Sequence, residues 1–150
     1  MKCAEPFAVP AILNPQLAGS YGYWASLRRG SAEIPFTDDL KPGALANIAN
    51  RLALLRVFHG PLRFRFSSTG QALVDEYGIE LDDRFLDEIS CFHPFEYSLS
   101  QACACVERGA PAFYRHNTAQ DGYVRLMLPF WGEGEINALL VVFGFGPWEA

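Results

Sequence analysis

The strongest constraint on the fold is a stretch of strictly alternating residues near the middle of the chain. Residues Leu62–Ser67 read Leu-Arg-Phe-Arg-Phe-Ser, and a period of two is typical of a half-buried β-strand. The preceding stretch, Leu52–Phe58, is apolar except for one arginine, and His59-Gly60-Pro61 forms a short link between the two. We therefore predict a β-hairpin whose second strand turns its leucine and phenylalanines to one face and its two arginines to the other.

Helical patterns lie on both sides of this hairpin, and three further strands end the chain. Leu17, Tyr21, Trp24 and Leu27 recur at helical spacing after Asn14, a residue that caps helices well. The expected helices run from Pro15 to the arginines before Gly30, from Pro42 to about Asn50, from Gln71 to Tyr77 and from Phe95 to Arg108, with a short piece at Arg84–Ile89. The expected strands are about Ala112–Thr118, Tyr123–Trp131 and Ile136–Phe145.

This order of elements predicts an α+β fold. Two strands, a helical insert and three strands form one antiparallel sheet with helices on one face. A length of 150 residues fits one domain. We expect a loose lead at residues 1–13 and a single domain at 14–150, with N-terminal helices at 14–50 and the core at 51–146.

Several motifs give the chain a family resemblance. Tyr23–Arg28 reads Tyr-Trp-Ala-Ser-Leu-Arg, Arg63–Thr69 ends the hairpin, Gly78–Asp87 follows it, and Arg125–Pro129 begins the late strands. In this order they resemble a family of PAS domains of alphaproteobacteria, over roughly residues 17–145. The chain departs from that family at turn positions, where serine and aspartates replace glycine and Thr-Gly. The resemblance implies a five-stranded antiparallel sheet, a helical insert between strands 2 and 3, N-terminal flanking helices, and a sensory or regulatory role.

A PAS domain holds its ligand between the inner sheet face and the helical insert, so the resemblance also implies candidate cavity residues. They either line an apolar pocket or fill the core. The candidates are Phe64, Phe66, Tyr77, Phe85, Phe92, His93, Phe95, Tyr97, Leu126 and Leu128. The ligand itself is left open.

Cofactor and metal signals are weak. His93 lies in the insert where haem-binding PAS domains supply an axial imidazole, but Pro94 follows it at once. Cys91 lacks the sequence context of a flavin-adduct cysteine. Cys103 and Cys105 are expected to be structural, because no second pair of ligands accompanies them. The other histidines, His59 and His116, are expected to face solvent.

The chain carries no motif of a known catalytic machinery, so we expect a non-enzymatic protein. The formal net charge of -5 disfavours binding to nucleic acid. No apolar stretch approaches the ~20 residues that span a bilayer, and no apolar leader is evident, so a cytoplasmic location with reduced cysteines is expected. The alternatives are a haem-binding PAS sensor and a small α+β barrel enzyme of the isomerase or dehydratase type, which would need an Asp or His in its pocket.

The helical stripe of Leu17, Tyr21, Trp24 and Leu27 is the expected site of contact with other molecules. It can pack on its own sheet, against a second copy of the chain, or both. The hypothesis from the sequence is therefore a regulatory domain that forms a homodimer or binds a signalling protein, with a small apolar ligand as a further partner.

Overall fold

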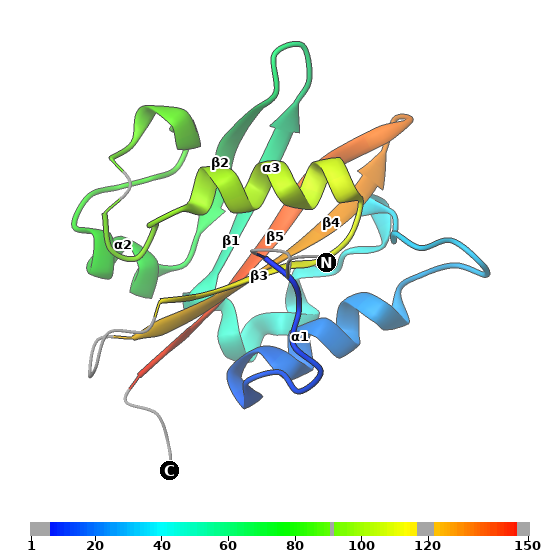
Figure 1. Cartoon of the computed structure of the whole chain (residues 1–150), viewed down its shortest axis with the longest axis horizontal. Helices are drawn as coiled ribbons and strands as arrows, with labels where there is room; N and C mark the ends of the chain where they lie inside the picture. The colour runs from blue at the N-terminus through cyan, green and yellow to red at the C-terminus, as the bar shows by residue number, and fades with distance from the viewer. Residues whose placement is uncertain (1–6, 91, 117–121, 147–150) are drawn as a thin grey trace, which may run out of the picture.

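One antiparallel sheet of five strands organises the computed structural model, which describes residues 7–90, 92–116 and 122–146 (Figure 1). The strands are β1 (Leu52–Phe58), β2 (Arg63–Thr69), β3 (Ala112–His116), β4 (Tyr123–Gly132) and β5 (Glu135–Phe145). Their order across the sheet is β2-β1-β5-β4-β3. The C-terminal strand therefore lies in the centre and joins the early hairpin to the late strands.

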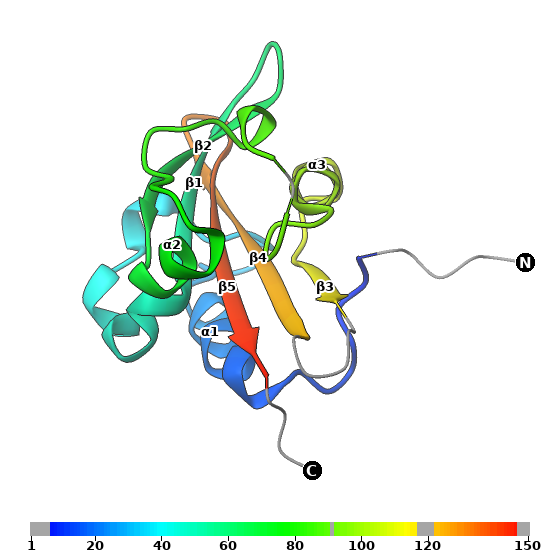
Figure 2. The same ribbon diagram turned by 90° about the vertical axis from the view of Figure 1, so that its left-hand side faces the viewer.

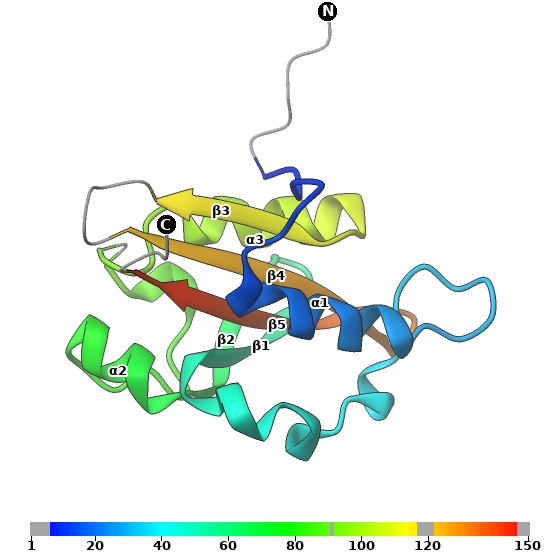
Figure 3. The ribbon, with the colours of Figure 1, turned by 90° about the horizontal axis from the view of Figure 1, so that it is seen from below.

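Helices cover both faces of this sheet. The N-terminal group is α1 (Pro15–Ser26) with the 3-10 helices η1 (Thr37–Asp39) and η2 (Pro42–Arg51); the insert between β2 and β3 holds α2 (Gln71–Tyr77), the 3-10 helix η3 (Leu86–Glu88) and α3 (Ser98–Arg108). Figures 2 and 3 show the sheet between α1 and α3. The expectation that all helices lie on one face was wrong. We call the face under α3 the inner face and the face under α1 and η2 the outer face.

Each face has its own apolar core. The inner core includes Phe64, Phe66, Leu73, Phe95, Met127 and Phe143. The outer core includes Leu17, Trp24, Leu126, Leu128, Phe130 and Leu140. Strands β4 and β5 supply side chains to both cores and are buried along most of their length. This burial on two sides explains why their sequences are continuously apolar rather than alternating.

Several local expectations are confirmed, and two boundaries are corrected. Asn14 caps α1 by accepting a hydrogen bond from the Gln16 amide at 2.9 Å. Helices α2 and α3 end at glycines with left-handed backbone, Gly78 and Gly109. Helix α1 ends at Ser26, before the two arginines, and α3 begins at Ser98 rather than at Phe95.

Other parts of the chain contact both edge strands of the sheet. On β2, the Phe66 amide donates to the Arg84 carbonyl at 2.9 Å, and the Asp83 amide donates to the Phe66 carbonyl at 2.8 Å. On β3, the Phe113 amide donates to the Phe7 carbonyl at 2.9 Å. Loop segments thus occupy part of the backbone of each edge.

Within the described residues, no helix combines the length and the apolar character needed to cross a bilayer.

Candidate functional site

Among the described residues, side chains pack closely over the inner face of the sheet. The cavity between this face and the helical insert measures about 10 Å³, and its walls include Phe66, Leu86, Phe95, Met127 and Arg125. A single water molecule needs roughly this much space. The aromatic side chains that could have lined a ligand pocket are therefore packed against one another.

The predicted lining residues divide into two groups on this face. Phe64, Phe66 and Phe95 are buried in the inner core, and Tyr77 packs edge-on against Phe95 with ring centroids 5.3 Å apart. Phe85 lies half-buried at the edge of β2, where it packs on Phe58. Phe92 and Tyr97 are 70% and 64% exposed. These last two side chains are exposed and do not belong to the inner core.

Leu126 and Leu128 require a correction, because both belong to the outer core under α1. The inner face of β4 carries Tyr123, Arg125 and Met127 instead. A strand buried on both sides shows no polar alternation, so its sequence did not reveal which residues face which way.

His93 lies at the rim of the inner core and not within it. Its Nε2 is 3.0 Å from the Glu76 carboxylate, and its ring meets Tyr123 edge-on at 5.2 Å. The imidazole is engaged by an acidic partner and an aromatic ring.

The most unusual group of the inner face is the fully buried guanidinium of Arg125. Its Nε donates to Gln101 Oε1 at 2.6 Å, its Nη1 to the Pro94 carbonyl at 2.9 Å, and its Nη2 to the Glu96 carbonyl at 2.7 Å. Gln101 in turn donates to the carbonyls of Ala112 and Arg125. One side chain of β4 thereby fastens the segment before α3, and α3 itself, to the sheet.

Aromatic rings and one carboxylate surround this guanidinium. It lies 4.8 Å from the Tyr114 ring centroid and 5.9 Å from that of Tyr123. Tyr123 donates its hydroxyl hydrogen to Glu96 at 2.6 Å. Burial lowers the pKa of Arg125 to about 10, so it still carries a charge at neutral pH. Burial, reinforced by the bond to Glu96, raises the pKa of Tyr123.

His116 completes this group, contrary to the expectation that it faces solvent. Its ring stacks on Tyr123 at 5.1 Å, its Nδ1 is 2.9 Å from the Tyr114 hydroxyl, and its Nε2 is 3.7 Å from Glu96. We call the six residues the Arg125 cluster, namely Glu96, Gln101, Tyr114, His116, Tyr123 and Arg125. Sequence reasoning missed it as a unit, although Arg125 is the one charge within the apolar run Tyr123–Trp131.

The chemistry of the cluster is that of a clamp. Among the described residues, the buried polar side chains are those of Ser20, Ser98, Gln101 and Arg125. None of these four is a carboxylate or an imidazole, and the Glu96 carboxylate and His116 imidazole of the cluster are each about a quarter exposed. Nε, Nη1 and Nη2 of the guanidinium each donate to an amide oxygen, and these bonds hold the side chain in place.

The cysteines that can be placed have structural surroundings. Cys105 is buried with its thiol directed at the Met127 carbonyl, 3.7 Å away, and burial raises its pKa. Burial also raises the pKa of the half-buried Cys103. Cys91 lies outside the described residues. Over the described parts of the chain, no three His, Cys, Asp or Glu side chains come together as a metal site.

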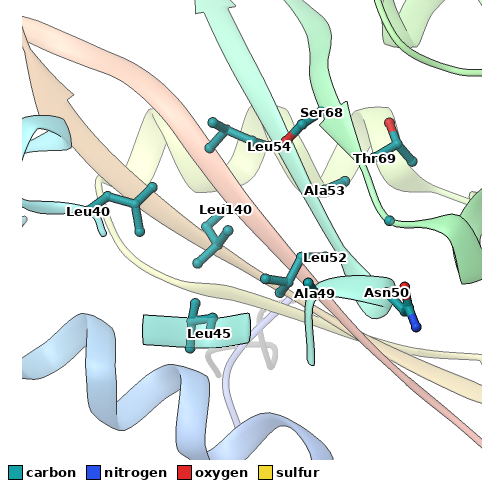
Figure 4. Close-up of a pocket in the computed structure, with 11 residues that line it drawn as sticks. Leu40, Leu45, Ala49, Asn50, Leu52, Ala53, Leu54, Ser68, Thr69 and Leu140 are labelled. Carbon is teal, nitrogen blue, oxygen red and sulfur yellow. The ribbon is translucent and has the colours of Figure 1, made fainter. Parts of the chain in front are cut away.

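An apolar groove of about 400 Å³ lies on the outer face, between η2 and the strands β1 and β5. Figure 4 shows the side chains that surround it, including Leu40, Leu45, Leu52, Leu54 and Leu140. This volume falls within the roughly 300–1,000 Å³ of small-molecule sites. Sequence reasoning did not anticipate it, because its walls come from segments whose contact depends on tertiary packing.

The helical stripe predicted for partner contact is largely used within the chain. Leu17 and Trp24 are buried against the outer face, and the Trp24 indole donates to the Pro129 carbonyl at 2.8 Å. Tyr21 and Leu27 pack against the same core and remain half-buried. Tyr21 and Leu27 are thus the members of the stripe that retain accessible surface.

The raised pKa of Tyr123 predicts a loss of stability at alkaline pH. An unfolded tyrosine loses its proton near pH 10, whereas the buried Tyr123 keeps it, so a rising pH favours the unfolded chain above about pH 10. A difference of one bound proton between the folded and the unfolded chain changes the free energy of unfolding by about 1.4 kcal/mol per pH unit. We expect the free energy of unfolding, measured with urea between about pH 9 and pH 11, to fall less steeply with pH in Tyr123→Phe than in the unmodified protein. If the free energy of unfolding fell equally with pH in both proteins, Tyr123 would not be the source of the alkaline loss of stability.

Two features therefore stand out in the described residues, the Arg125 cluster on the inner face and the apolar groove on the outer face. The first fixes the helical insert to the sheet, and the second leaves apolar side chains accessible. Compared with protein-family models, with curated proteins and with solved structures, the chain matches none of them.

Proposed function

We propose that the chain is a non-enzymatic regulatory domain of the PAS type that acts by contact with another protein. Its elements follow the expected order of two strands, a helical insert and three strands in one antiparallel sheet. The N-terminal helices precede that core, as the sequence motifs of the PAS resemblance lead one to expect. This arrangement supports the proposal without naming a partner.

The observation that carries the proposal is the filled inner face. A cavity of about 10 Å³ cannot enclose a haem, a flavin or a metabolite, for which sites of about 300 Å³ or more are usual. The Arg125 cluster adds a rigid, hydrogen-bonded link where a sensor would hold its ligand. A domain with this interior transmits information through its surface.

The enzyme alternative has less support. An isomerase or dehydratase of this size would place an aspartate or histidine in an apolar pocket, and the walls of the inner cavity carry neither among the described residues. The haem alternative would require His93 to exchange its Glu76 contact for iron and the core to open. Neither alternative is favoured by a specific contact.

Two accessible regions can supply the contact with a protein partner. The half-buried Tyr21 and Leu27 lie on α1 and just after it, and they suit a homodimer. The exposed Phe92 and Tyr97 flank the segment that Arg125 fastens, and they suit a signalling partner that recognises aromatic side chains.

Native mass spectrometry, compared with the denatured mass, tests the proposal. We expect a homodimer without added mass, and we expect Tyr21→Glu to convert it to monomer while Ile79→Glu, on an exposed residue elsewhere, does not. A species that carries a mass released on denaturation, together with visible absorption of a haem or flavin, would overturn the proposal. A Tyr21→Glu dimer would overturn the assignment of the dimer contact to α1.

A further inference from the structure

An open cavity of about 270 Å³ lies where the loop after α1 meets the last residues of β4. Its walls include Ala32, Glu33, Ile34, Phe36 and Trp131. Figure 3 shows this loop beside the turn that joins β4 to β5. The volume is slightly below the roughly 300 Å³ at which sites for whole small molecules begin, so the cavity suits a headgroup or the end of a side chain.

Backbone contacts hold the two aromatic residues of this cavity next to each other. The Trp131 amide donates to the Pro35 carbonyl at 2.9 Å, and the Thr37 hydroxyl donates to the Trp131 carbonyl at 3.4 Å. An isolated parallel bridge thereby pairs Phe36 with Trp131. A shift in register between Phe130 and Trp131 interrupts β4, and such bulges commonly redirect a side chain. The loop and the strand thus present the two rings from adjacent backbones.

The Trp131 ring is available to a ligand. It is 37% exposed, and among the described residues its indole makes no hydrogen bond, ring contact or cation contact. Phe36 differs, because the Arg29 guanidinium lies 5.0 Å from its ring centroid. That guanidinium pairs with Asp39 and does not line the cavity. The chain therefore already places one cation on an aromatic ring here, and it leaves the larger aromatic face of Trp131 unused.

A carboxylate supplies the charge of the cavity. Glu33 is exposed, lines the cavity, and has no hydrogen bond or ion pair among the described residues. Across residues 29–39 one arginine is accompanied by one glutamate and two aspartates, which gives a net charge of -2. The electrostatic field of this loop therefore favours a cation, and the adjacent aromatic faces favour a cation that is weakly hydrated.

We propose that this cavity binds a quaternary ammonium group, with its methyl groups against Phe36 and Trp131 and its charge beside Glu33. Ca²⁺ and Mg²⁺ are poor matches, because each takes about six or more oxygen ligands. A primary ammonium has three donors to satisfy, and the described walls offer a single carboxylate. A choline-like small molecule and a trimethylated lysine of another protein carry the same quaternary group. The inference stands independently of the proposed regulatory function, since the cavity involves neither the Arg125 cluster nor Tyr21.

NMR titration of the full chain with choline tests this inference. The signal of the Trp131 indole N–H, assigned by its loss in Trp131→Phe, should shift together with the amide signals of Ala32 and Ile34. The neutral isostere 3,3-dimethylbutan-1-ol has the shape of choline with carbon in place of nitrogen, and it should bind at least about fivefold more weakly. Peptides with and without a trimethylated lysine identify the source of the group. Tighter binding of choline indicates a free small molecule, and tighter binding of the modified peptide indicates a protein side chain.

Variants separate the contribution of the ring from that of the charge. Trp131→Leu should weaken choline binding about tenfold, and Trp131→Phe, which keeps a smaller aromatic face, should weaken it less. Glu33→Gln should weaken it about threefold, because it removes a charge at an exposed site. Glu80→Gln is the matched control, since Glu80 is an exposed glutamate of the helical insert, and it should leave the affinity unchanged. The amide signals of Ala32 and Ile34 report binding in every variant, and circular dichroism melts verify that each is folded.

Three results would overturn the inference. Equal affinity for choline and its neutral isostere would show binding through apolar contact alone. Unchanged affinity in Trp131→Leu would place the ligand elsewhere. Signals of the Trp131 indole and the loop amides that stay unshifted with choline up to about 50 mM would exclude the site, because cation–π contacts and an exposed ion pair predict binding in the range of about 1–10 mM.

Discussion

Replacing Arg125 with methionine is expected to lower the free energy of unfolding by about 3–5 kcal/mol. Methionine keeps the length and apolar character of the side-chain stem, but it removes every donor of the guanidinium. The carbonyl oxygens of Pro94 and Glu96 and the Gln101 Oε1 would then lose the bonds that they accept from Arg125. Urea unfolding followed by circular dichroism measures the loss.

The matched variant is Arg125→Lys, which retains the charge and one donor group. A lysine ammonium cannot reproduce the planar fork, so we expect it to recover only part of the loss. Amide hydrogen exchange gives a second readout: in Arg125→Met the amide of Ser98, which donates to the Phe95 carbonyl, should exchange faster than in the unmodified protein. A change in stability below about 1 kcal/mol, with unchanged exchange at Ser98, would refute the clamp assigned to Arg125.

Replacing Trp24 with alanine is expected to cost about 3–5 kcal/mol. The indole is 2% exposed and packs on the outer core, so its removal leaves a cavity under α1. It also deprives the Pro129 carbonyl of its donor. The free energy of unfolding, measured by urea titration, should fall accordingly.

Two variants separate the contributions at this position. Trp24→Phe keeps an aromatic ring in the outer core and removes the pyrrole part of the indole with its N–H, so we expect a smaller loss of about 1–2 kcal/mol. Trp131→Ala, at a tryptophan that is 37% exposed, should cost less than Trp24→Ala. If Trp24→Ala were as stable as Trp131→Ala, α1 would not be anchored on its own sheet, and its stripe would be free for a partner.

Local signals were sufficient to predict much of this fold. The alternation in Leu62–Ser67 correctly predicted β2 and the inward direction of its phenylalanines. Gly78 and Gly109 correctly marked the ends of α2 and α3, because a left-handed residue is needed there. In each case the deciding interaction lies within a few residues of the chain.

Features that depend on distant residues could not be predicted in this way. The segment before α3 was expected to be helical, but Arg125, on a strand far along the chain, binds the carbonyls of Pro94 and Glu96. Those carbonyls are then not available to a regular helix. Arg29, expected at the end of α1, instead pairs with Asp39 beyond the helix. The first of these two corrections comes from tertiary bonds that override local preference.

The sequence was sufficient to identify residues of the candidate site but not their arrangement. The aromatic residues of the inner face were identified, but whether they enclose a space or fill it depends on how their side chains pack. Leu126 could not be assigned to a face, because β4 is buried on both sides.

The contacts at the two edges of the sheet bear on how the protein behaves at high concentration. Exposed edge strands recruit further strands and lead to fibrous aggregates. Here the loop at Arg84 binds β2, and Phe7 binds β3, so each edge already has backbone partners. Growth of the sheet from one molecule to the next would first have to displace these segments. Release of either segment, at Arg84 or at Phe7, is therefore expected to expose a sheet edge and to promote fibril formation.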